Sequence, residues 1–181
     1  DAKFGDVTEE FDQPTFTKSR PITFLNNNIL LPLHSTRHLK FIDDSQSFFS
    51  KKNAAIFRGA CYQSHRKRFI ELAKNIKLIN AEDTSSHIGT NIWGKPLNFL
   101  PIRKQLNYKF IFCIEGNDVA SNLKWVMGSN SIPVMPKPKY ETWFCESRLI
   151  AGMHYIEVQD DFSNIEEVIE NYINKPKLCE E

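Results

Sequence analysis

The sequence predicts an α/β protein with a Rossmann-like parallel sheet and helices on both faces of that sheet. From Lys52 onward, short apolar segments of strand length alternate with segments whose apolar residues recur at helical spacing, an alternation typical of a parallel sheet. Within it, residues 108–131 indicate a buried strand, a tight glycine turn and a helix, which is one half of a βαβ unit. Ligands of such sheets bind beyond the carboxyl ends of the strands, so we expect a site there.

Residues 1–50 differ from the rest of the chain. Pro and Asn are scattered through them, and strand and helix patterns do not alternate. The apolar segment 29–33 is the one candidate for a short strand. We therefore expect irregular structure with one short strand in this region.

The first strand and helix of the alternating region are expected at residues 54–57 and 64–75. The strand is apolar and ends in Arg58-Gly59, and Ser64 is a candidate N-cap of the helix. The helix has a face formed by Phe69, Leu72, Ala73 and Ile76. The pattern then predicts a strand at 77–80, a polar connection at 81–101 and a short helix ending within 103–107.

The second unit starts with a strand at 108–114, which ends in Glu115-Gly116-Asn117-Asp118. Val119, Ala120, Leu123 and Met127 then recur at helical spacing, which predicts a helix directly after the turn. Such a turn aims free backbone N–H groups and the positive end of a helix dipole at whatever lies above the strand, a common way to hold phosphate. A phosphate cradle that includes Lys124 and an ordinary strand–helix connection fit this pattern equally well.

The remaining elements are short. Residues 131–135 predict a strand closed by Pro136-Lys137-Pro138, residues 140–146 a helical turn, and residues 154–158 a further strand. Asp161 or Ser163 caps the last helix, and Ser163 with Glu166 fits a capping box. That helix has an apolar face made of Ile165, Val168, Ile169 and Tyr172. The carboxyl-end rule therefore selects Arg58-Gly59, residues 115–118 and the loop around Pro136.

The composition argues against several classes of protein. With 23 basic and 22 acidic residues, the net charge is +1, which does not indicate binding to nucleic acid or an anionic membrane across the whole chain. The sequence shows no apolar run near the roughly 18 residues that span a bilayer and no signal-peptide pattern. Four scattered cysteines without a CxxC pair argue against a zinc knuckle and favour a reduced, intracellular protein. The histidines lack metal-binding spacing, so no metal site is expected from His34, His38, His65, His87 and His154.

Single residues carry weaker signals. The guanidinium of Arg58, at the end of a buried strand, suits a diphosphate, although a surface arginine before a turn glycine has the same pattern. Glu146 fits either an acceptor for ribose hydroxyls or an exposed carboxylate at a helix end. Asp6, Asp43 and Asp44 are candidate general bases or ordinary loop carboxylates. GxGxxG, Walker-lysine and GxSxG motifs are absent from the sequence.

Several blocks, taken in order, resemble glycosyltransferase family 90. This family holds the lipopolysaccharide-modifying lipopolysaccharide A proteins, fungal capsule-associated xylosyltransferases and animal protein O-glucosyltransferases. The resemblance runs from about Lys52 to Ile173, more weakly back to the start, and is greatest to the bacterial lipopolysaccharide branch. No single block would suffice, but their order and spacing are specific. The blocks are Phe57-Arg58-Gly59 with Arg66, Asn80-Ala81-Glu82-Asp83-Thr84, Tyr108-Lys109-Phe110, residues 116–131, Arg148-Leu149-Ile150, His154-Tyr155-Ile156 and Asp160-Asp161-Phe162-Ser163.

The resemblance implies a GT-B-type fold, in which two Rossmann-like domains face each other across a cleft. Residues 1–50 would then be a remnant of the acceptor-side domain with a linker. Residues 51–181 would be the domain that binds the nucleotide-sugar donor, without its C-terminal helices. The protein is accordingly expected to be incomplete, and in that form it can be inactive.

The resemblance also implies an activity, namely transfer of a sugar from a UDP-sugar to a hydroxyl of a lipopolysaccharide or related glycan, with inversion and without a metal or other cofactor. Asp6 is the best positional match for the general base. Without a metal, Arg58 and the 116–121 turn would neutralise the diphosphate. Many relatives have arginine at the position of Asn122, and Lys124 with Arg58 is expected to compensate. The implied donor-binding residues are Arg58, Gly59, Arg66, Glu82, Gly116, Asn117, Ala120, Ser121, Asn122, Lys124 and Glu146.

The expected partners are the UDP-sugar and a glycan or lipopolysaccharide acceptor, with no nucleic acid. The expected location is cytoplasmic, with peripheral association at the inner face of the membrane left open. The alternative function is a non-catalytic or truncated domain for nucleotide binding or interaction. The position of Asp6 relative to Arg58 and Gly116 separates these hypotheses. Another kind of Rossmann enzyme is disfavoured, because the dinucleotide fingerprint is missing.

Overall fold

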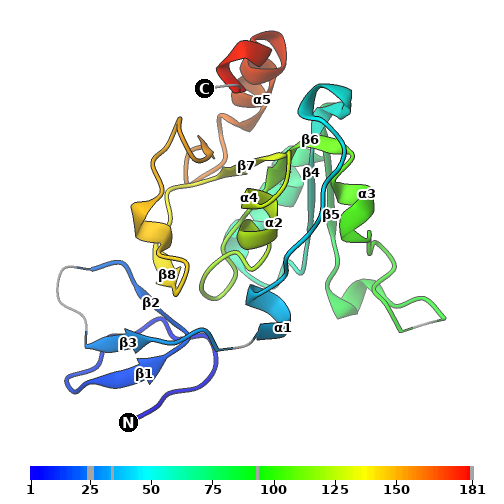
Figure 1. The fold of residues 1–181 in the computed structure, drawn as a ribbon. Coiled ribbons are helices and arrows are strands. Elements are labelled where there is room, and N and C mark those ends of the chain that lie inside the picture. Colours follow the sequence, from blue (N-terminus) through cyan, green and yellow to red (C-terminus); the bar gives the residue numbers. More distant parts are fainter. Residues whose placement is uncertain (24–26, 34, 93, 180–181) are drawn as a thin grey trace.

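The computed structural model describes residues 1–23, 27–33, 35–92 and 94–179. At its centre lies a parallel sheet of five strands in the order β5-β4-β6-β7-β9 (Figure 1). This sheet confirms the predicted α/β class. Its strands are β4 (Lys52–Gly59), β5 (Ile79–Asp83), β6 (Tyr108–Phe112), β7 (Ile132–Met135) and β9 (Ile156–Glu157).

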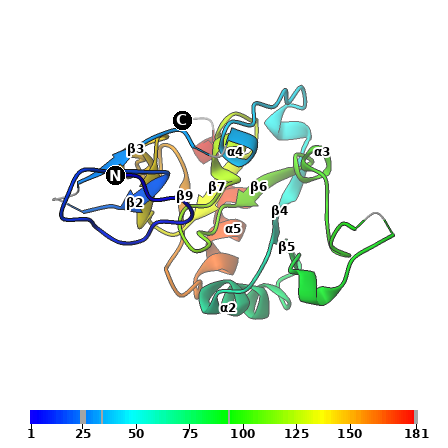
Figure 2. The same cartoon turned by 90° about the horizontal axis from the view of Figure 1, so that it is seen from below.

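Helices cover both faces of the sheet, as predicted (Figure 2). Because side chains alternate along a strand, Phe57 and Phe112 enter one core cluster while Ile56 and Ile111 enter the other. The first cluster is completed by α2 and α5, and the second by α4. The helices are α2 (Ser64–Ala73), α3 (Ile102–Gln105), α4 (Leu123–Met127) and α5 (Ile165–Asn174).

Phe69 of α2 is the centre of the first core cluster. It is fully buried, and its ring centroid lies 5.1 Å from that of Phe57, 4.7 Å from that of Phe112 and 5.2 Å from that of Phe162. Aromatic pairs in tilted or edge-to-face geometry contribute beyond the area they bury. Phe69 therefore fixes α2 against the strands whose carboxyl ends form the site described below.

The first fifty residues contain more regular structure than the single short strand that was predicted. β1 (Thr15–Thr17) pairs in parallel with β3 (Asn28–Leu30), and β2 (Ser19–Pro21) pairs antiparallel with β8 (Tyr140–Thr142). Arg20 strengthens the second ladder, since its Nε donates to Glu141 Oε1 at 2.9 Å. The chain also forms α1 (Ser35–His38), η1 (Phe48–Ser50), η2 (Ser86–Ile88), η3 (Glu146–Arg148) and η4 (Pro176–Cys179).

The helical turn predicted at 140–146 is wrong. Residues Tyr140–Thr142 are extended because they pair with β2, which lies far away in the sequence. A short 3-10 turn, η3, forms only after them. The predicted second strand is also displaced, because turn hydrogen bonds from Ile76 N to Ala73 O and from Ile79 N to Ile76 O delay the start of β5.

The predicted helix starts also need correction. α2 has Gln63 rather than Ser64 as its N-cap, and α5 has Asn164 rather than Asp161 or Ser163. Among the described residues, neither cap position makes a side-chain cap hydrogen bond. Ser163 Oγ instead donates to Gln159 Oε1 and Asp161 Oδ1, which closes the preceding loop. α4 starts at Leu123, so the turn at 115–118 does not pass directly into a helix.

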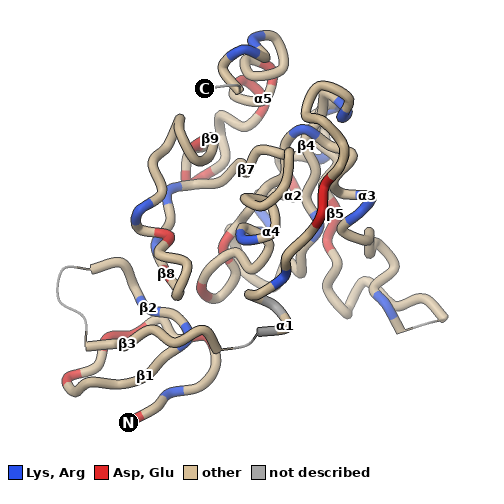
Figure 3. The backbone as a smooth tube through the Cα atoms, in the orientation of Figure 1, with Lys and Arg blue, Asp and Glu red and all other residues tan. Residues whose placement is uncertain are grey.

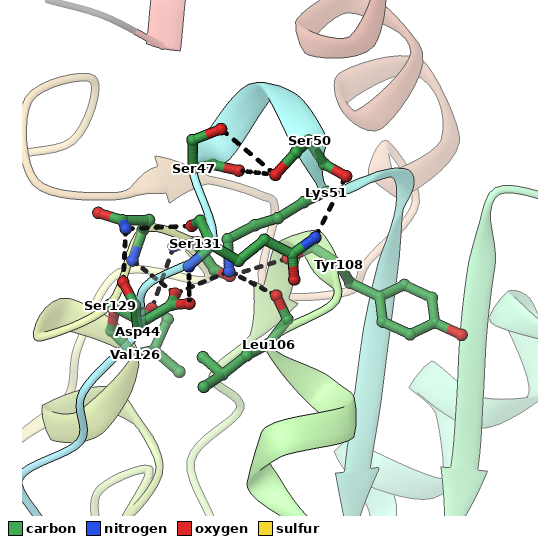
Figure 4. Close-up of polar contacts among 11 residues, drawn as sticks. Asp44, Ser47, Ser50, Lys51, Leu106, Tyr108, Val126, Ser129 and Ser131 are labelled. Atoms are coloured by element: carbon green, nitrogen blue, oxygen red, sulfur yellow. Dashed lines mark hydrogen bonds and ion pairs between the residues drawn. The ribbon is translucent and has the colours of Figure 1, made fainter.

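A buried ion pair fastens the segment before β4 to the amino ends of the strands (Figure 4). Lys51 Nζ lies 2.7 Å from Asp44 Oδ2 and also donates to the carbonyl of Leu106, just before β6. Asp44 Oδ2 accepts from the backbone N–H of Asn130, just before β7, at 2.9 Å. Asp44 therefore has a structural role at the edge of the sheet opposite to the carboxyl ends of the strands.

Acidic and basic residues are interspersed along the described chain (Figure 3). Within the same residues, no helix has both the length and the apolar character needed to cross a membrane.

Candidate functional site

The sheet places a topological switch point between β4 and β6. The chain passes from β4 to β5 on one side of β4 and then returns to add β6, β7 and β9 on the other side. In sheets of this kind the crevice at such a switch point, outside the carboxyl ends of the strands, binds ligands. Here the crevice lies between the loop that follows Gly59 and the turn at Gly116.

Two cavities flank the turn at Gly116 and Asn117. We call the first, of about 350 Å³, the Tyr140 cavity, and the second, of about 310 Å³, the Asp6 cavity. The Tyr140 cavity is lined by Gln63, His65, Ile114, Glu115, Gly116, Asn117, Pro136, Lys137, Lys139, Tyr140, Asp160 and Phe162. The Asp6 cavity is lined by Asp6, Lys18, His38, Ala60, Tyr62, Gln63, Arg66, Gly116, Asn117, Asp118, Val119 and Ser121.

Arg66 of α2 fills the floor of the crevice. Its Nη1 donates to Ala60 O at 2.9 Å, while its Nη2 and Nε donate to Ile114 O at 2.6 Å and Glu115 O at 2.9 Å. One guanidinium thus satisfies carbonyl groups that follow both β4 and β6. Burial lowers the pKa of Arg66, and nearby Cys61, Asp83 and Glu115 oppose that shift. An arginine side chain is nevertheless a cation at neutral pH.

Gly116 allows the guanidinium of Arg66 to approach the turn closely. A Cβ atom at this position would lie 3.3 Å from Arg66 Nη2, tighter than ordinary van der Waals contact. Within the turn, the N–H of Gly116 donates to Asp118 O at 3.0 Å, so this group is already used. The phosphate cradle predicted for the turn stays a prediction.

Asp6 belongs to a charged cluster that joins the N-terminal segment to the turn. Lys18 Nζ lies 2.5 Å from Asp6 Oδ1 and 2.9 Å from Asp118 Oδ2. Asn117 Nδ2 donates to Asp6 Oδ2 at 3.1 Å, and Gln63 Nε2 donates to Asn117 Oδ1 at 2.7 Å. Asp6 therefore faces the same cavity as Gly116, although the two are far apart in the sequence.

Glu115 is a carboxyl group in the wall of the Tyr140 cavity. Burial raises its pKa to about 7, with a further contribution from Asp118. The backbone N–H groups of Lys139 and Tyr140, which donate to Oε1 at 2.9 and 3.2 Å, oppose the rise. Glu115 thus ties the end of β6 to the loop after β7 and changes its charge near neutral pH.

Phe162 forms another part of the same wall in a strained conformation. Its φ is 60°, in the left-handed region that costs about 1–2 kcal/mol for a residue with a Cβ atom. The ring is buried against Phe69, and this packing offsets the cost. Asp160 and Phe162 both line the Tyr140 cavity.

Three of the predicted donor-binding residues lie at the β4–β5 edge of the crevice, outside the linings of these two cavities. Arg58 donates from Nη1 to Phe57 O and Asn80 O at 2.7 and 2.9 Å, and from Nη2 to Asn80 Oδ1 at 2.8 Å. Burial lowers the Arg58 pKa, opposed by Glu82 and Tyr108. Glu82 pairs with Arg58 in the ladder. A Cβ atom at Gly59 would lie 2.7 Å from the ring of Phe57.

Four other predicted residues point into the protein. Lys124 Nζ lies 2.5 Å from Glu146 Oε1, both side chains are buried, and Glu146 Oε2 accepts from Thr142 N at 2.7 Å. Desolvation lowers the Lys124 pKa, with Glu146 opposing it. Asn122 Nδ2 donates to Phe112 O at 2.9 Å, and Ala120 is buried. The residues that gather at the Asp6 cavity are Asp6, Arg66, Gly116, Asn117 and Ser121. The donor-binding roles stay predictions.

Lys18 was not identified from the sequence, and Glu115 lay within a predicted site location but was assigned no role. Lys18 lies in the segment Lys18-Ser19-Arg20-Pro21, which has no motif that points to it. Glu115 directly follows an apolar strand, so the carboxyl-end rule contained the signal. In the described part of the chain, no group of three or more His, Cys, Asp or Glu residues is placed to hold a metal ion. His34, one of the histidines considered, lies outside the described residues.

Two comparisons with known proteins identify relatives of this chain. A family model described as Glycosyl transferase family 90 matches residues 29–181. The sequence is 44% identical over 182 residues to the O-glucosyltransferase LpsA of Dichelobacter nodosus. The aligned region covers 99% of this chain and 56% of that protein. The chain therefore spans about half the length of this curated relative.

Proposed function

The chain belongs to glycosyltransferase family 90, and on that premise we propose that it transfers a sugar from a UDP-sugar to a hydroxyl group of a lipopolysaccharide or related glycan. The relative's name, O-glucosyltransferase, makes glucose the sugar to test first. One observation carries the proposal: Asp6 and the Gly116 turn line the same cavity at the carboxyl edge of the sheet. A carboxylate and a candidate donor-binding turn thus face each other across space large enough for reacting groups.

In the proposed reaction, Asp6 is the general base. It accepts the proton of the acceptor hydroxyl while the oxygen of that hydroxyl attacks the anomeric carbon. The bond from this carbon to the diphosphate oxygen breaks, and its electron pair leaves with UDP. A single displacement of this kind inverts the anomeric centre. Although Lys18 and Asn117 engage the Asp6 oxygens, a carboxylate oxygen has two lone pairs, so acceptor capacity remains.

The charge that develops on the leaving diphosphate requires positive groups nearby. Arg66 supplies a fixed cation at the floor of the Asp6 cavity, and Lys137 and Lys139 line the Tyr140 cavity. The residues support a mechanism without a metal ion, because cationic side chains are present on both sides of the turn. To contact the diphosphate, Arg58 would have to break its hydrogen bonds to Asn80. Its proposed contact with the diphosphate therefore needs a test of its own.

We place the nucleoside of the donor in the Tyr140 cavity. Ile114, Pro136 and Phe162 supply apolar surface there, and a volume of about 350 Å³ falls within the range of small-molecule sites. The diphosphate would then lie over Gly116, and the sugar would reach into the Asp6 cavity. This order brings the anomeric carbon to the side on which Asp6 lies.

Binding of the donor without turnover is the alternative. It is favoured by the contacts of Asp6 with Lys18 and Asn117, which hold the carboxylate within a salt-bridge cluster. A turnover measurement distinguishes sugar transfer from donor binding alone, because both require the donor site and only sugar transfer requires a base.

Calorimetry and a UDP-release assay test the proposal. UDP is expected to bind equally well in EDTA and in Mg²⁺. UDP-glucose is expected to release UDP as its glucosyl group passes to the hydroxyl of an added glycan or of water. Asp6→Asn should lower the release rate by about 100-fold or more, the scale of a lost general base, while UDP affinity changes little. Asp12→Asn is the matched control, because Asp12 is an exposed carboxylate in the same segment.

Two results would contradict the proposal in different ways. A folded protein that does not bind UDP would remove the donor site. Release of UDP by Asp6→Asn at the wild-type rate would remove Asp6 as the base and leave donor binding intact. Arg58→Ala, measured in the same calorimeter, decides whether Arg58 contributes to UDP affinity.

A further inference from the structure

Lys18 is buried between two carboxylates of different parts of the chain. Its side chain is 8% exposed, and its Nζ lies 2.5 Å from Asp6 Oδ1 and 2.9 Å from Asp118 Oδ2. Asp118 is equally buried, whereas the side chain of Asp6 is 32% exposed. Of the two carboxylates, Asp6 is therefore the one that solvent or a substrate in the cavity reaches.

The backbone around this cluster is held in place by further bonds. Ser19, the neighbour of Lys18, accepts from Val7 N at 3.1 Å and donates to Val7 O at 3.2 Å through its Oγ. Val7 in turn directly follows Asp6. The bonds between Ser19 and Val7 therefore hold the neighbouring backbone of Lys18 and Asp6 together. This arrangement places the two charged side chains close to each other.

We propose that Lys18 is a positioning residue for sugar transfer, which holds the Asp6 carboxylate ionised and facing the Asp6 cavity by bridging it to Asp118. This inference rests on the proposed function, because it takes Asp6 to be the general base. Lys18 does not exchange a proton with the substrate in this scheme. It acts through Asp6, by fixing the orientation and charge state of that side chain.

The electrostatics support this role. Desolvation lowers the pKa of Lys18, but hydrogen bonds and charges from Asp6 and Asp118 outweigh it, so the pKa is raised above 10.5. Lys18 is therefore a cation throughout the neutral range. Without it, Asp6 would lose the cation that lies 2.5 Å from its Oδ1 and favours its ionised form. A protonated Asp6 cannot accept the hydroxyl proton.

Other charged or titratable groups also face Asp6. Asp118 lies in the turn, Arg66 on α2, His38 on α1 and Tyr62 in the loop after β4, and all of them line the Asp6 cavity. Arg66 directs three hydrogen bonds to backbone carbonyls, and Asp118 has the same charge as Asp6. Lys18 makes the direct ion pair, so its removal is the perturbation that acts on Asp6 first.

The test is the pH dependence of UDP release from UDP-glucose by the full chain. For Lys18→Met, we expect kcat at pH 7 to fall by about 10-fold or more, within the range for impaired general-base catalysis. We expect the acid limb of the profile to move up by about one pH unit or more, because a neighbouring cation stabilises a carboxylate by that amount. KM for UDP-glucose should change much less than kcat. Lys18→Arg keeps the charge and should keep the acid limb in its wild-type place.

A double-mutant cycle separates positioning from a general structural effect. If Lys18 acts through Asp6, adding Lys18→Met to Asp6→Asn should lower UDP release little further. Lys3→Met is the matched control, because Lys3 is an exposed lysine of the same segment, paired with Glu9 at 3.8 Å. An acid limb that stays in place in Lys18→Met, while Asp6→Asn abolishes turnover, would overturn the inference and leave the proposed function standing. Wild-type turnover in Asp6→Asn would overturn the proposed function itself.

Lys18→Met leaves Asp118 buried without a cation, which can prevent folding. In that case Lys18→Met with Asp118→Asn replaces it, because this pair of substitutions removes both buried charges. Asp118→Asn alone is its control. The acid limb of the double variant should still lie at higher pH than that of the control, and coincident limbs would overturn the inference.

Discussion

Replacement of Arg66 by methionine tests whether this arginine builds the site or binds the donor. The side chain donates three hydrogen bonds to carbonyls at the ends of β4 and β6, at 2.6 to 2.9 Å. Hydrogen bonds that involve a charged group contribute about 1.5–3 kcal/mol each. The desolvation that lowers the Arg66 pKa offsets part of this, and water in the cavity can solvate the exposed carbonyls. We therefore expect a net loss of about 3–4 kcal/mol from the free energy of unfolding.

Urea titration followed by tryptophan fluorescence and circular dichroism measures this loss. A loss of that size corresponds to a fall in Tm of roughly 6–16 °C for a chain of this length. Arg66→Lys, which keeps the charge but not the three-way geometry, should lose about half as much. Arg68→Met is the matched control on the same helix, since Arg68 and Asp161 form an exposed pair that contributes about 1 kcal/mol at most.

A loss for Arg66→Met no larger than that of Arg68→Met would refute this reasoning. If UDP affinity then fell while stability did not, Arg66 would be a donor ligand rather than a support for the crevice.

Three further predictions concern stability. Because burial raises the pKa of Glu115 to about 7, the folded protein binds this proton more tightly than the unfolded chain. The free energy of unfolding should fall by up to about 3 kcal/mol as pH rises from about 4.5 to 7, and urea titrations of Glu115→Gln should lack this part of the decline. Desolvation raises the pKa of Asp44, but hydrogen bonds from Lys51, Asn130 and Gln46 outweigh it and leave the pKa lowered. The stabilisation by Asp44 is therefore present above about pH 4 and lost as pH falls further, and acid titrations of Asp44→Asn should show a smaller loss. Phe69→Ala should cost about 3–5 kcal/mol by urea unfolding, against less than about 1 kcal/mol for the exposed Phe49.

The parallel sheet could be predicted because its signals are local. The predicted strands 54–57 and 108–114 are largely apolar runs with turn residues after them, and the helix 64–73 has an apolar stripe that contains Phe69. Each pattern is complete within one element, so a single sequence is enough to identify it. The carboxyl-end rule then located the Gly116 turn, which borders both cavities.

The errors occurred where distant residues decide the local structure. Tyr140–Thr142 is a strand because β2 lies beside it, and no nearby residue carries that information. Lys124 was assigned to the phosphate cradle, and Glu146 to ribose hydroxyls or an exposed helix end, yet the two side chains form an ion pair inside the protein. Lys18 gains its significance from Asp6 and Asp118, and the second of these is 100 positions away along the chain. Contacts between residues so far apart leave no local pattern in a single sequence, so the structure is needed to find them.

The ladder between β2 and β8 has a consequence for the order in which the protein assembles. The paired residues Arg20 and Glu141 are separated by 121 positions. At a translation rate of roughly 5–20 residues per second, the later strand is synthesised about 6–24 s after the earlier one. During that interval β2 has no β8 to pair with, and closing so long a loop is a slow, late event. Phe162 and α5, which complete the core around Phe69, also follow β8 in the chain. The β2–β8 ladder and the complete core therefore both depend on the part of the chain from residue 140 onward, which is synthesised last.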